Sequence, residues 1–338
     1  MVVKYSYIRR IFAMKSDLRT IAANTGYSIA TVSRALNGEK YVSEAVRKKI
    51  FAEASRLGRR TERNTVLVIT SIQLLGTGYL SKVLKKLWEQ LVYDGFRCEL
   101  VTSDSIDVIE EQLIAGAISL MSTDGLEQYW GKNFSVPLVC INTSSSHLHN
   151  VWSVLTEEYG AMKMLLEHLY NHDHRKIMLL AAPEQSSYQY CAATRREAFA
   201  SITSQMKLEA APVTSIIWNE PGIMVQKIIK SGVTAVIVSS ESFIEPLITS
   251  LRYHGIRVPE DISVCGWIYK DGRAVENTVT GVEQDFDGLV KNAVSNLKKL
   301  IAKEKITQDI FVPCLWLDRL TTAPAKAAGG IEEGKKTF

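Results

Sequence analysis

Two short helical patterns meet at a glycine near the start of the chain, and this arrangement constrains the fold more than any other feature. Leu18–Ala23 carries apolar residues at helical spacing, Gly26 interrupts the pattern, and a second helical pattern extends from Ser28 to Asn37. Serine suits the N-terminal cap of a helix, because its hydroxyl accepts a hydrogen bond from a backbone N–H of the first turn. The spacing predicts a helix-turn-helix, whose second helix enters the major groove of DNA.

A third helix is predicted from Glu44 to Leu57, with Ser43 as its cap and Gly58 at its end. The apolar residues of this helix fall on one face, and they are Val46, Ile50, Ala54 and Leu57. We expect this face to pack against the first two helices and to complete the core of a small all-α domain.

Positive charge is concentrated in the same part of the chain. Residues 1–63 contain 14 Lys and Arg against 5 Asp and Glu, a net charge of +9, whereas the rest of the chain has a net charge of −5. A basic segment attached to a near-neutral or acidic remainder is typical of a domain that binds phosphates. Together with the helix-turn-helix pattern, this charge distribution predicts double-stranded DNA as a partner.

Composition excludes several other classes of protein. With 338 residues, 46% of them hydrophobic, the chain can bury more than one core. No apolar run approaches the roughly 18–20 residues of a membrane span, and the first residues lack a secretory signal, so we expect a cytoplasmic protein with no membrane partner. The 5 cysteines include no CxxC pair, which indicates buried, reduced thiols. The sequence shows no convincing Ser-His-acid or paired-carboxylate pattern of the kind that catalysis uses, so we expect neither enzyme activity nor a cofactor.

From about residue 65 onward, short apolar runs alternate with amphipathic segments. The runs predicted to be strands are Thr65–Ile69, Cys98–Thr102, Ala117–Leu120, Leu138–Ile141, Ile177–Leu180, Ser215–Trp218, Ala235–Val238 and Ile262–Cys265. The predicted helices are Leu80–Tyr93, Tyr159–Tyr170, Thr194–Ser204, Gly222–Ile229 and Phe243–His254. This alternation indicates parallel sheets with helices on both faces, and the number of units favours two similar lobes with a ligand site between them.

The segment from Gly26 to Ile50, GYSIATVSRALNGEKYVSEAVRKKI, resembles the DNA-binding signature of the lactose repressor (LacI/GalR) family. In that signature, a G-x-S-x-x-T-V-S-R-x-L-N run precedes a V-S-x-x-x-R helix. The resemblance implies that Ile29, Ala30 and Arg34 read bases, and that Thr31, Ser33, Asn37 and Tyr41 mainly contact phosphates. The predicted DNA-binding set also includes Ser28 at the start of the second helix, and Arg59 and Arg60 in the basic segment that follows the third. The alternative is that the hydroxyl and amide groups only cap and solvate the helix.

The linker departs from the family pattern. Family members follow the third helix with a Pro-Asn segment and a small hinge helix, whose leucine wedges into the minor groove. Residues 58–64 of this chain read GRRTERN and lead directly into the first predicted strand, so the hinge helix is expected to be missing. Arg59, Arg60 and Arg63 could neutralise phosphates or form a solvated spacer. The short linker predicts DNA binding that is weakly coupled to any effector.

Three later stretches resemble the sensor domain of the same family, which is itself similar to periplasmic sugar-binding proteins. They are EHLYNHDHRKI at 167–177, GIRVPEDISVCGW at 255–267 and LDRLTTAP at 317–324. The implied fold is an all-α helix-turn-helix headpiece followed by an α/β two-lobed, periplasmic-binding-protein-like sensor with parallel sheets. The expected domains are a DNA-binding domain at 14–58, a basic linker at 59–64, an effector-binding and dimerisation domain at 65–324 and a flexible tail at 325–338. The first boundary reflects Met14, a possible natural start.

The family's effector-binding residues carry over only in part. Arg195 matches the arginine that grips the effector through its planar fork, Gln284 matches a polar position of the pocket, and Ser71 is expected to line the other lobe.

Two acidic motifs of the family's pocket are replaced in this chain. The family's G-F-D-D becomes GWIY at 266–269, and its N-D pair becomes Ser240 and Glu241. A pocket with Trp267 and Tyr269 favours stacking on a flat ligand or on the face of a sugar. The implied effector-binding set is Ser71, Arg195, Ser240, Glu241, Trp267, Tyr269 and Gln284. A cleft that binds nothing is the alternative.

These features predict a sequence-specific DNA-binding transcriptional regulator. The common mode of the family implies a repressor that responds to a small, sugar-like ligand. Because one helix-turn-helix reads only a few base pairs, we expect a homodimer on a pseudo-palindromic operator. A transport solute-binding protein and a regulator that acts through protein contacts are the alternatives. His168, His172 and His174 are not expected to bind metal, because no fourth ligand is evident.

Overall fold

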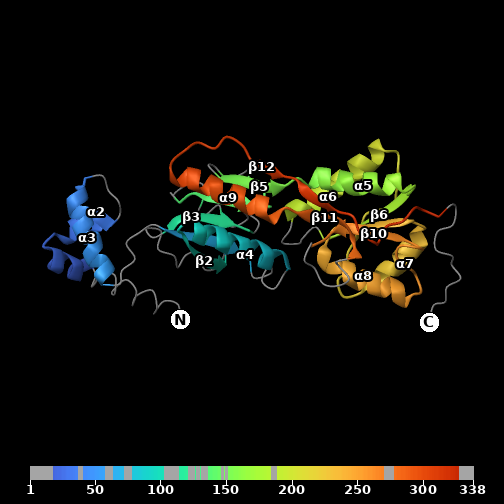
Figure 1. Cartoon of the computed structure of the whole chain (residues 1–338), viewed down its shortest axis with the longest axis horizontal. Helices are drawn as coiled ribbons and strands as arrows, with labels where there is room; N and C mark the ends of the chain where they lie inside the picture. The colour runs from blue at the N-terminus through green and yellow to red at the C-terminus, as the bar shows by residue number, and fades with distance from the viewer. Residues whose placement is uncertain are drawn as a thin grey trace. The chain divides into compact units, whose positions relative to one another are not determined.

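The computed structural model describes residues 18–36, 41–57, 64–71, 78–102, 114–120, 126, 130, 136–145, 148, 151–183, 189–269 and 278–326. Contacts divide the chain into two compact units. The first unit extends to Thr65, and the second begins at Val66 and contains most of the remaining chain. Figure 1 shows the elements of both units.

The N-terminal unit is all-α. A helix covers residues 18–25, α2 spans Ile29–Leu36 and α3 spans Glu44–Arg56. Gly26 lies in the turn with a φ of 78°, a left-handed conformation that glycine adopts without steric cost. The buried apolar core comprises Ile21, Ala22, Val32, Ala35, Ile50 and Ala54. The predicted helix-turn-helix is therefore confirmed.

One residue predicted on the apolar face of the third helix is not buried. Leu57 is 39% exposed, because α3 ends at Arg56 and the next residue no longer follows the helical face. Gly58, predicted to stop this helix, lies outside the described residues.

The larger unit contains two sheets, one in each of two lobes. The first sheet has the order β12-β5-β4-β3-β1-β2, with β1 Thr65–Thr70, β2 Arg97–Thr102, β3 Ile114–Ser119, β4 Leu138–Ile141, β5 Val151–Thr156 and β12 Ile310–Val312. The second has the order β13-β11-β10-β9-β6-β7, with β6 Lys176–Ala181, β7 Glu209–Ala210, β9 Ala235–Val238, β10 Ser263–Trp267, β11 Thr280–Gln284 and β13 Cys314–Leu317. A short strand, β8 Thr214–Ser215, also pairs with β6.

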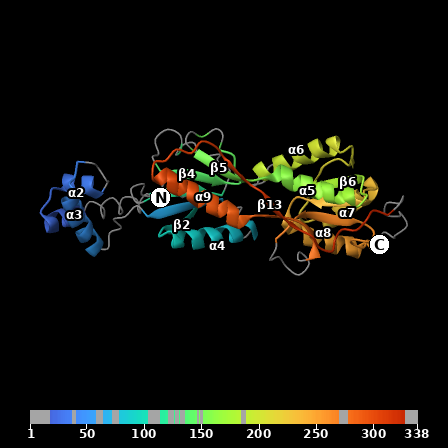
Figure 2. The same cartoon turned by 45° about the horizontal axis from the view of Figure 1, so that its top comes forward.

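Helices cover the sheets in pairs that are close in space. In the first lobe, α4 Gly78–Tyr93 packs beside α9 Phe286–Ile301 (Figure 2). In the second lobe, α5 Glu158–Asn171 and α6 Gln189–Gln205 cover one face of the sheet, and α7 Pro221–Ser231 and α8 Glu241–Tyr253 cover the other (Figure 1). The predicted two-lobed α/β architecture with parallel strand pairing is confirmed. β13 pairs antiparallel with β11.

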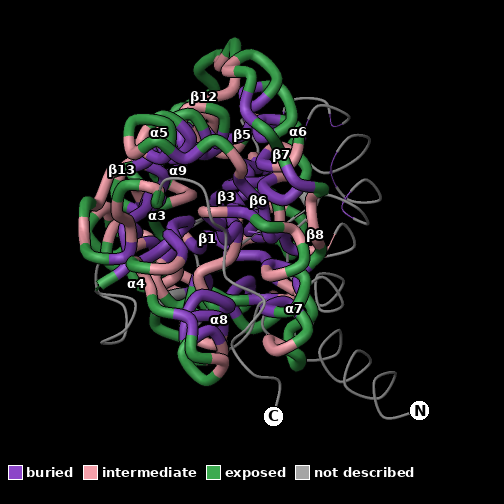
Figure 3. Tube along the Cα trace, turned by 90° about the vertical axis from the view of Figure 1, so that its right-hand side faces the viewer, coloured by how far each residue is buried: buried purple, intermediate pink, exposed green. Residues whose placement is uncertain are grey.

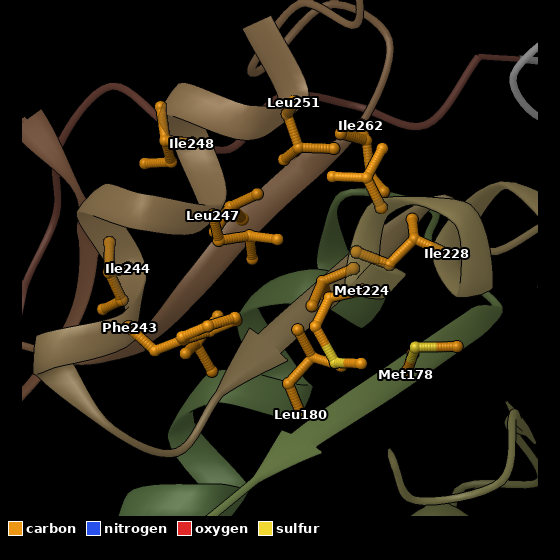
Figure 4. Packing of buried hydrophobic residues seen from close by; sticks show 14 of the residues in the cluster. Met178, Leu180, Met224, Ile228, Phe243, Ile244, Leu247, Ile248, Leu251 and Ile262 are labelled. Atoms are coloured by element: carbon orange, nitrogen blue, oxygen red, sulfur yellow. The ribbon is translucent and has the colours of Figure 1, made fainter. Parts of the chain in front are cut away.

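Strand residues in the second lobe alternate between two apolar cores. Ile177 and Leu179 of β6 belong to the core under α5 and α6. Met178 and Leu180 belong to the core under α7 and α8, where Leu180 lies close to Phe243 (Figure 4). This alternation follows from the two-residue repeat of a strand, and it explains why both faces of the sheet are apolar. Buried residues are accordingly concentrated in the strands (Figure 3).

The chain passes between the lobes three times, after β5, after β11 and after β12. Two of these crossings lead directly into a helix with a carboxylate cap. Glu157 Oε2 accepts the N–H of Gly160 at 2.7 Å, and Asp285 Oδ1 accepts the N–H of Gly288 at 2.9 Å. These caps fix the start of α5 and of α9.

The predicted strand Ser215–Trp218 is largely wrong. Sheet pairing ends at Ser215, and the exposed ring of Trp218 instead packs edge-on against Phe243, with ring centroids 5.9 Å apart. At the other end of the chain, the first residue of the predicted flexible tail is bonded to the second lobe, because the Ala325 N–H donates to His172 O at 2.8 Å. In the described part of the chain, no helix is both long enough and apolar enough to cross a membrane.

Candidate DNA interface and effector site

Helix α2 presents opposite faces to the core and to solvent. Val32 and Ala35 are buried, whereas Ile29, Ala30 and Arg34 are exposed. Ile29 is 46% exposed although it is a large apolar residue at the first position of the helix. An apolar side chain and an arginine that are both exposed on one helix suit contact with base edges and thymine methyl groups.

The start of α2 is fixed by hydroxyl groups. Ser28 Oγ accepts the backbone N–H of Thr31 at 3.0 Å and lies 2.8 Å from Thr31 Oγ1. The predicted cap is therefore present, and these two hydroxyls have a structural role in the protein. Ser33 is half-buried, and Tyr41 is 94% exposed. Asn37, Arg59 and Arg60, which the sequence places in the DNA-binding set, lie outside the described residues.

A polar contact ties the first helix to α3. Asn24 Nδ2 donates to Glu53 Oε1 at 2.7 Å, and Arg56 Nη2 donates to the same oxygen at 2.7 Å. The hydrogen bonds from Arg56 and Asn24 lower the pKa of Glu53 to about 2. Lys49 Nζ lies 5.6 Å from the centre of the Tyr27 ring. These contacts tie the first helix, and Tyr27 in the turn that precedes α2, to α3.

In the larger unit, Arg195 of α6 is the centre of a buried polar cluster. Its Nε donates to Glu158 Oε2 at 2.8 Å, and its Nη2 donates to Glu158 Oε1 at 2.7 Å. Its Nη1 donates to the backbone oxygen of Ser239 at 2.5 Å, and its Cζ lies 4.1 Å from the centre of the Trp267 ring. Burial alone would lower the pKa of Arg195, but the attraction of Glu158 outweighs it and raises this pKa above its ordinary value.

The cluster continues from the second lobe into the first. Gln284 Nε2, at the end of β11, donates to Glu158 Oε1 at 3.3 Å. Asn142 Nδ2, just after β4, lies 3.4 Å from Gln284 Oε1 and 3.2 Å from the Tyr79 hydroxyl on α4. Asn142 Oδ1 also accepts from Thr156 at the end of β5. We call Tyr79, Asn142, Glu158, Arg195, Trp267 and Gln284 the interlobe cluster.

A second group of contacts surrounds Tyr269, which follows β10. Its hydroxyl donates to Glu241 Oε1 at 2.7 Å, and its ring lies 5.9 Å from that of Phe286. Lys82 Nζ of α4 lies 4.9 Å from the centre of the same ring. Tyr269 is only 9% exposed, so this aromatic side chain packs between the lobes.

Several buried polar atoms have no hydrogen-bond partner among the described residues. They include Trp267 Nε1, at the end of β10, and the hydroxyls of Thr70 and Ser71, at the end of β1. Carboxyl ends of strands are where ligands bind in open α/β sheets, and unpaired buried donors are costly unless a ligand or water satisfies them.

The structure brings some of the predicted effector-binding residues together and leaves others apart. Arg195, Trp267 and Gln284 meet in the interlobe cluster, and Glu241 meets Tyr269. Ser240 Oγ lies 3.2 Å from Ser242 Oγ on the surface of α8.

Glu158, Asn142 and Tyr79 were not predicted from the sequence. Glu158 follows β5, a strand that the apolar pattern did not indicate, so the carboxyl end of that strand was not recognised. Asn142 directly follows the correctly predicted strand Leu138–Ile141, and a polar residue at that position was the available signal.

Two protein-family models match the chain. Residues 17–58 match "Bacterial regulatory proteins, lacI family", and residues 166–322 match "Periplasmic binding protein-like domain". The chain belongs to the LacI family of bacterial regulatory proteins. Similar full-length LacI-family relatives include the ribose operon repressor of Bacillus subtilis (strain 168), 22% identical over 333 residues that cover 91% of this chain and 98% of the relative. The regulator MalR of Streptomyces coelicolor is 26% identical over 353 residues, which cover 95% of this chain and 100% of that protein.

Solved LacI-family structures share the fold. A lac repressor dimer bound to operator and the anti-inducer ONPF superposes with a TM-score of 0.67 at 20% identity, covering 90% of this chain and 98% of that one. A complex of the transcriptional regulator CelR with cellobiose gives a TM-score of 0.64 at 21% identity, covering 90% of this chain and 99% of that one.

Proposed function

We propose that this LacI-family chain is a sequence-specific transcriptional repressor, rather than an enzyme, which acts in the cytoplasm as a homodimer and binds a small effector between its lobes. In this proposal, residues 14–58 bind DNA, residues 59–64 form a basic linker and residues 65–324 sense the effector and dimerise. The observation that carries the proposal is the exposed face of α2, where Ile29, Ala30 and Arg34 lie opposite a buried apolar face.

A homodimer is supported by an apolar patch in the first lobe. Trp88 and Val92 of α4 are each 53% exposed, and Tyr93 is 86% exposed. Leu100, 42% exposed, lies on β2, the edge strand next to α4. Contiguous exposed apolar groups of this kind mark protein contact surfaces, and a two-fold dimer would bring two α2 helices to one pseudo-palindromic site.

An effector in the interlobe cluster is supported by the unpaired Trp267 Nε1 and by the proximity of Arg195 and Gln284. Two similar proteins are named for ribose and for a cellobiose complex. We therefore propose a small polyhydroxylated molecule, similar to a sugar, as the effector of this chain.

The test compares DNA from the protein's own promoter region with random DNA of equal length, by fluorescence anisotropy over a salt series. We expect wild type to prefer the promoter DNA, and Arg34→Ala to lose about 1–3 kcal/mol of that preference while retaining salt-sensitive binding to both DNAs. Arg252→Ala, which removes an exposed arginine from the second lobe, is the matched control. Equal wild-type affinity for the two DNAs would contradict the proposal.

The same titration with a panel of sugars and nucleosides tests coupling. Because the sequence of residues 58–64 lacks the family's hinge pattern, we propose that an effector changes operator affinity only weakly. A many-fold change with any ligand of the panel would refute this part of the proposal.

A further inference from the structure

The arginine that matches the family's effector-gripping position is already paired within the protein. Both oxygens of Glu158 accept hydrogen bonds from Arg195, through Nε and Nη2, in the two-pronged geometry that a bound carboxylate or phosphate would use. The side chain of Glu158 is 0% exposed and that of Arg195 is 9% exposed, so water screens this pair little.

We propose that Glu158 is an internal ligand of Arg195 and is the residue that restricts the effector of this chain to uncharged molecules. The inference rests on the proposed function, because it defines the chemical class of the effector that the proposed regulator binds.

The guanidinium group has little capacity left for an anion. Of its five N–H groups, two face Glu158 and one donates to Ser239 O, while the Trp267 ring covers the group at 4.1 Å. The remaining N–H groups can each donate one hydrogen bond to a neutral oxygen. The parallel pair formed by the Nε and Nη2 N–H groups already holds both oxygens of Glu158, so an anion that binds this pair bidentately would have to displace Glu158.

Displacement of Glu158 is unfavourable because the carboxylate has no route to water. Glu158 is the first residue of α5, next to the capping residue Glu157, and Gln284 Nε2 donates to its Oε1. An entering anion would leave a buried, unpaired carboxylate beside its own negative charge. The pair therefore leaves the site without net charge, so the binding of acids and phosphate esters is unfavourable.

The other polar groups at the strand ends suit a neutral ligand. Trp267 Nε1 can only donate, whereas the Thr70 and Ser71 hydroxyls can donate or accept, and none has a partner among the described residues. Hydroxyl or amide groups of an uncharged molecule can satisfy such atoms without a counter-charge.

The experiment asks whether removal of Glu158 converts the site into an anion site. Glu158→Gln and Glu158→Ala are made in the full chain, with Glu167→Gln as the matched control, because Glu167 lies on the same helix with its side chain 51% exposed. The midpoint of thermal unfolding is measured at neutral pH in sodium acetate and in sodium chloride of equal ionic strength. Acetate is the probe because it has the carboxylate that Glu158 loses.

We expect acetate to raise the midpoint of both Glu158 variants by several degrees relative to chloride, and to leave wild type and Glu167→Gln unchanged within a degree. The double variant Glu158→Gln with Arg195→Gln removes both charges, and it should fold and lose the response. If the single variants are unfolded in chloride, recovery of folding in acetate supports the proposal, and failure to recover while the double variant folds overturns it. An equal response of wild type, or no response of folded Glu158 variants, also overturns it. DNA takes no part in these measurements, so failure of the repressor proposal would be seen separately.

Discussion

The Tyr269 hydroxyl donates to Glu241 Oε1 at 2.7 Å, and the ring that carries it lies against the first residue of α4 in the other lobe. That residue is Gly78, where an added Cβ would lie 2.9 Å from Tyr269 Cε2. The absence of a side chain at Gly78 is thus what allows the tyrosine ring to pack between the lobes.

A methyl group at Gly78 should therefore disturb this contact. We expect Gly78→Ala to lower the free energy of unfolding by about 1–3 kcal/mol, because overpacking forces the ring or α4 to shift. Urea unfolding followed by tryptophan fluorescence measures the change. Gly222→Ala is the control, since the nearest atom to its added Cβ is 3.8 Å away.

Removal of the ring should relieve the strain at Gly78. The cost of Gly78→Ala should fall towards zero in a Tyr269→Ala background, whereas it should persist in Tyr269→Phe, which keeps the ring. If Gly78→Ala costs the same in all three backgrounds, the tyrosine is not the group that the methyl meets.

Two histidines hold the C-terminal segment to the second lobe. His174 Nε2 lies 2.9 Å from Ala323 O, and His168 Nε2 lies 2.8 Å from Thr322 Oγ1. Burial lowers the pKa of His174, although its bond to Ala323 O opposes this, and burial together with neighbouring His172 lowers the pKa of His168.

Stability should therefore fall as the pH falls. A histidine whose pKa is lower in the folded than in the unfolded protein stabilises the fold fully above its ordinary pKa of about 6.5, where both states are neutral. Below that pH the unfolded chain binds the proton first, and the stability is lost towards the lower, folded pKa. We expect urea unfolding from pH 7.5 to pH 5 to show this decline, and His174→Gln to flatten it.

Local sequence patterns predict most of the helices and strands, and the elements that they miss have a physical explanation. Leu138–Ile141 and Ala235–Val238 were predicted to the residue, because buried strands read as continuous apolar runs. β11, with the sequence TGVEQ, was missed because its buried Thr280 and Gln284 are polar. Tertiary hydrogen bonds compensate these side chains, because the Thr280 hydroxyl oxygen accepts the backbone N–H of Arg319 at 3.0 Å, for example. A local pattern contains no sign of such distant partners.

The interlobe cluster shows the same limit more strongly. Resemblance identified Arg195, Gln284 and Trp267, which the structure brings together. Glu158 lies 37 positions before Arg195 in the sequence and meets it only because two helices cover the same face of one sheet. A single sequence cannot reveal that this carboxylate occupies the fork of the arginine. In the N-terminal unit, by contrast, Ile29, Ala30 and Arg34 lie within one helix, so local helical spacing is enough to place them on the face opposite Val32 and Ala35 once the resemblance has singled them out.

The apolar patch on α4 and β2 leads to a prediction about assembly. Val92 is exposed on α4, so Val92→Asp leaves the apolar core of the lobe unchanged and places a charge on the surface proposed to meet a second copy. An unpaired carboxylate in such an interface should weaken dimerisation about 100-fold, which corresponds to roughly 3 kcal/mol. Sedimentation equilibrium over a concentration series measures this, and Leu320→Asp, at a residue 71% exposed near the C-terminal end of the second lobe, is the control. Because each protomer contributes one α2 helix, the monomeric variant should also bind operator DNA more weakly and with preference for half-sites. If Val92→Asp dimerises as wild type does, the two copies meet through another surface.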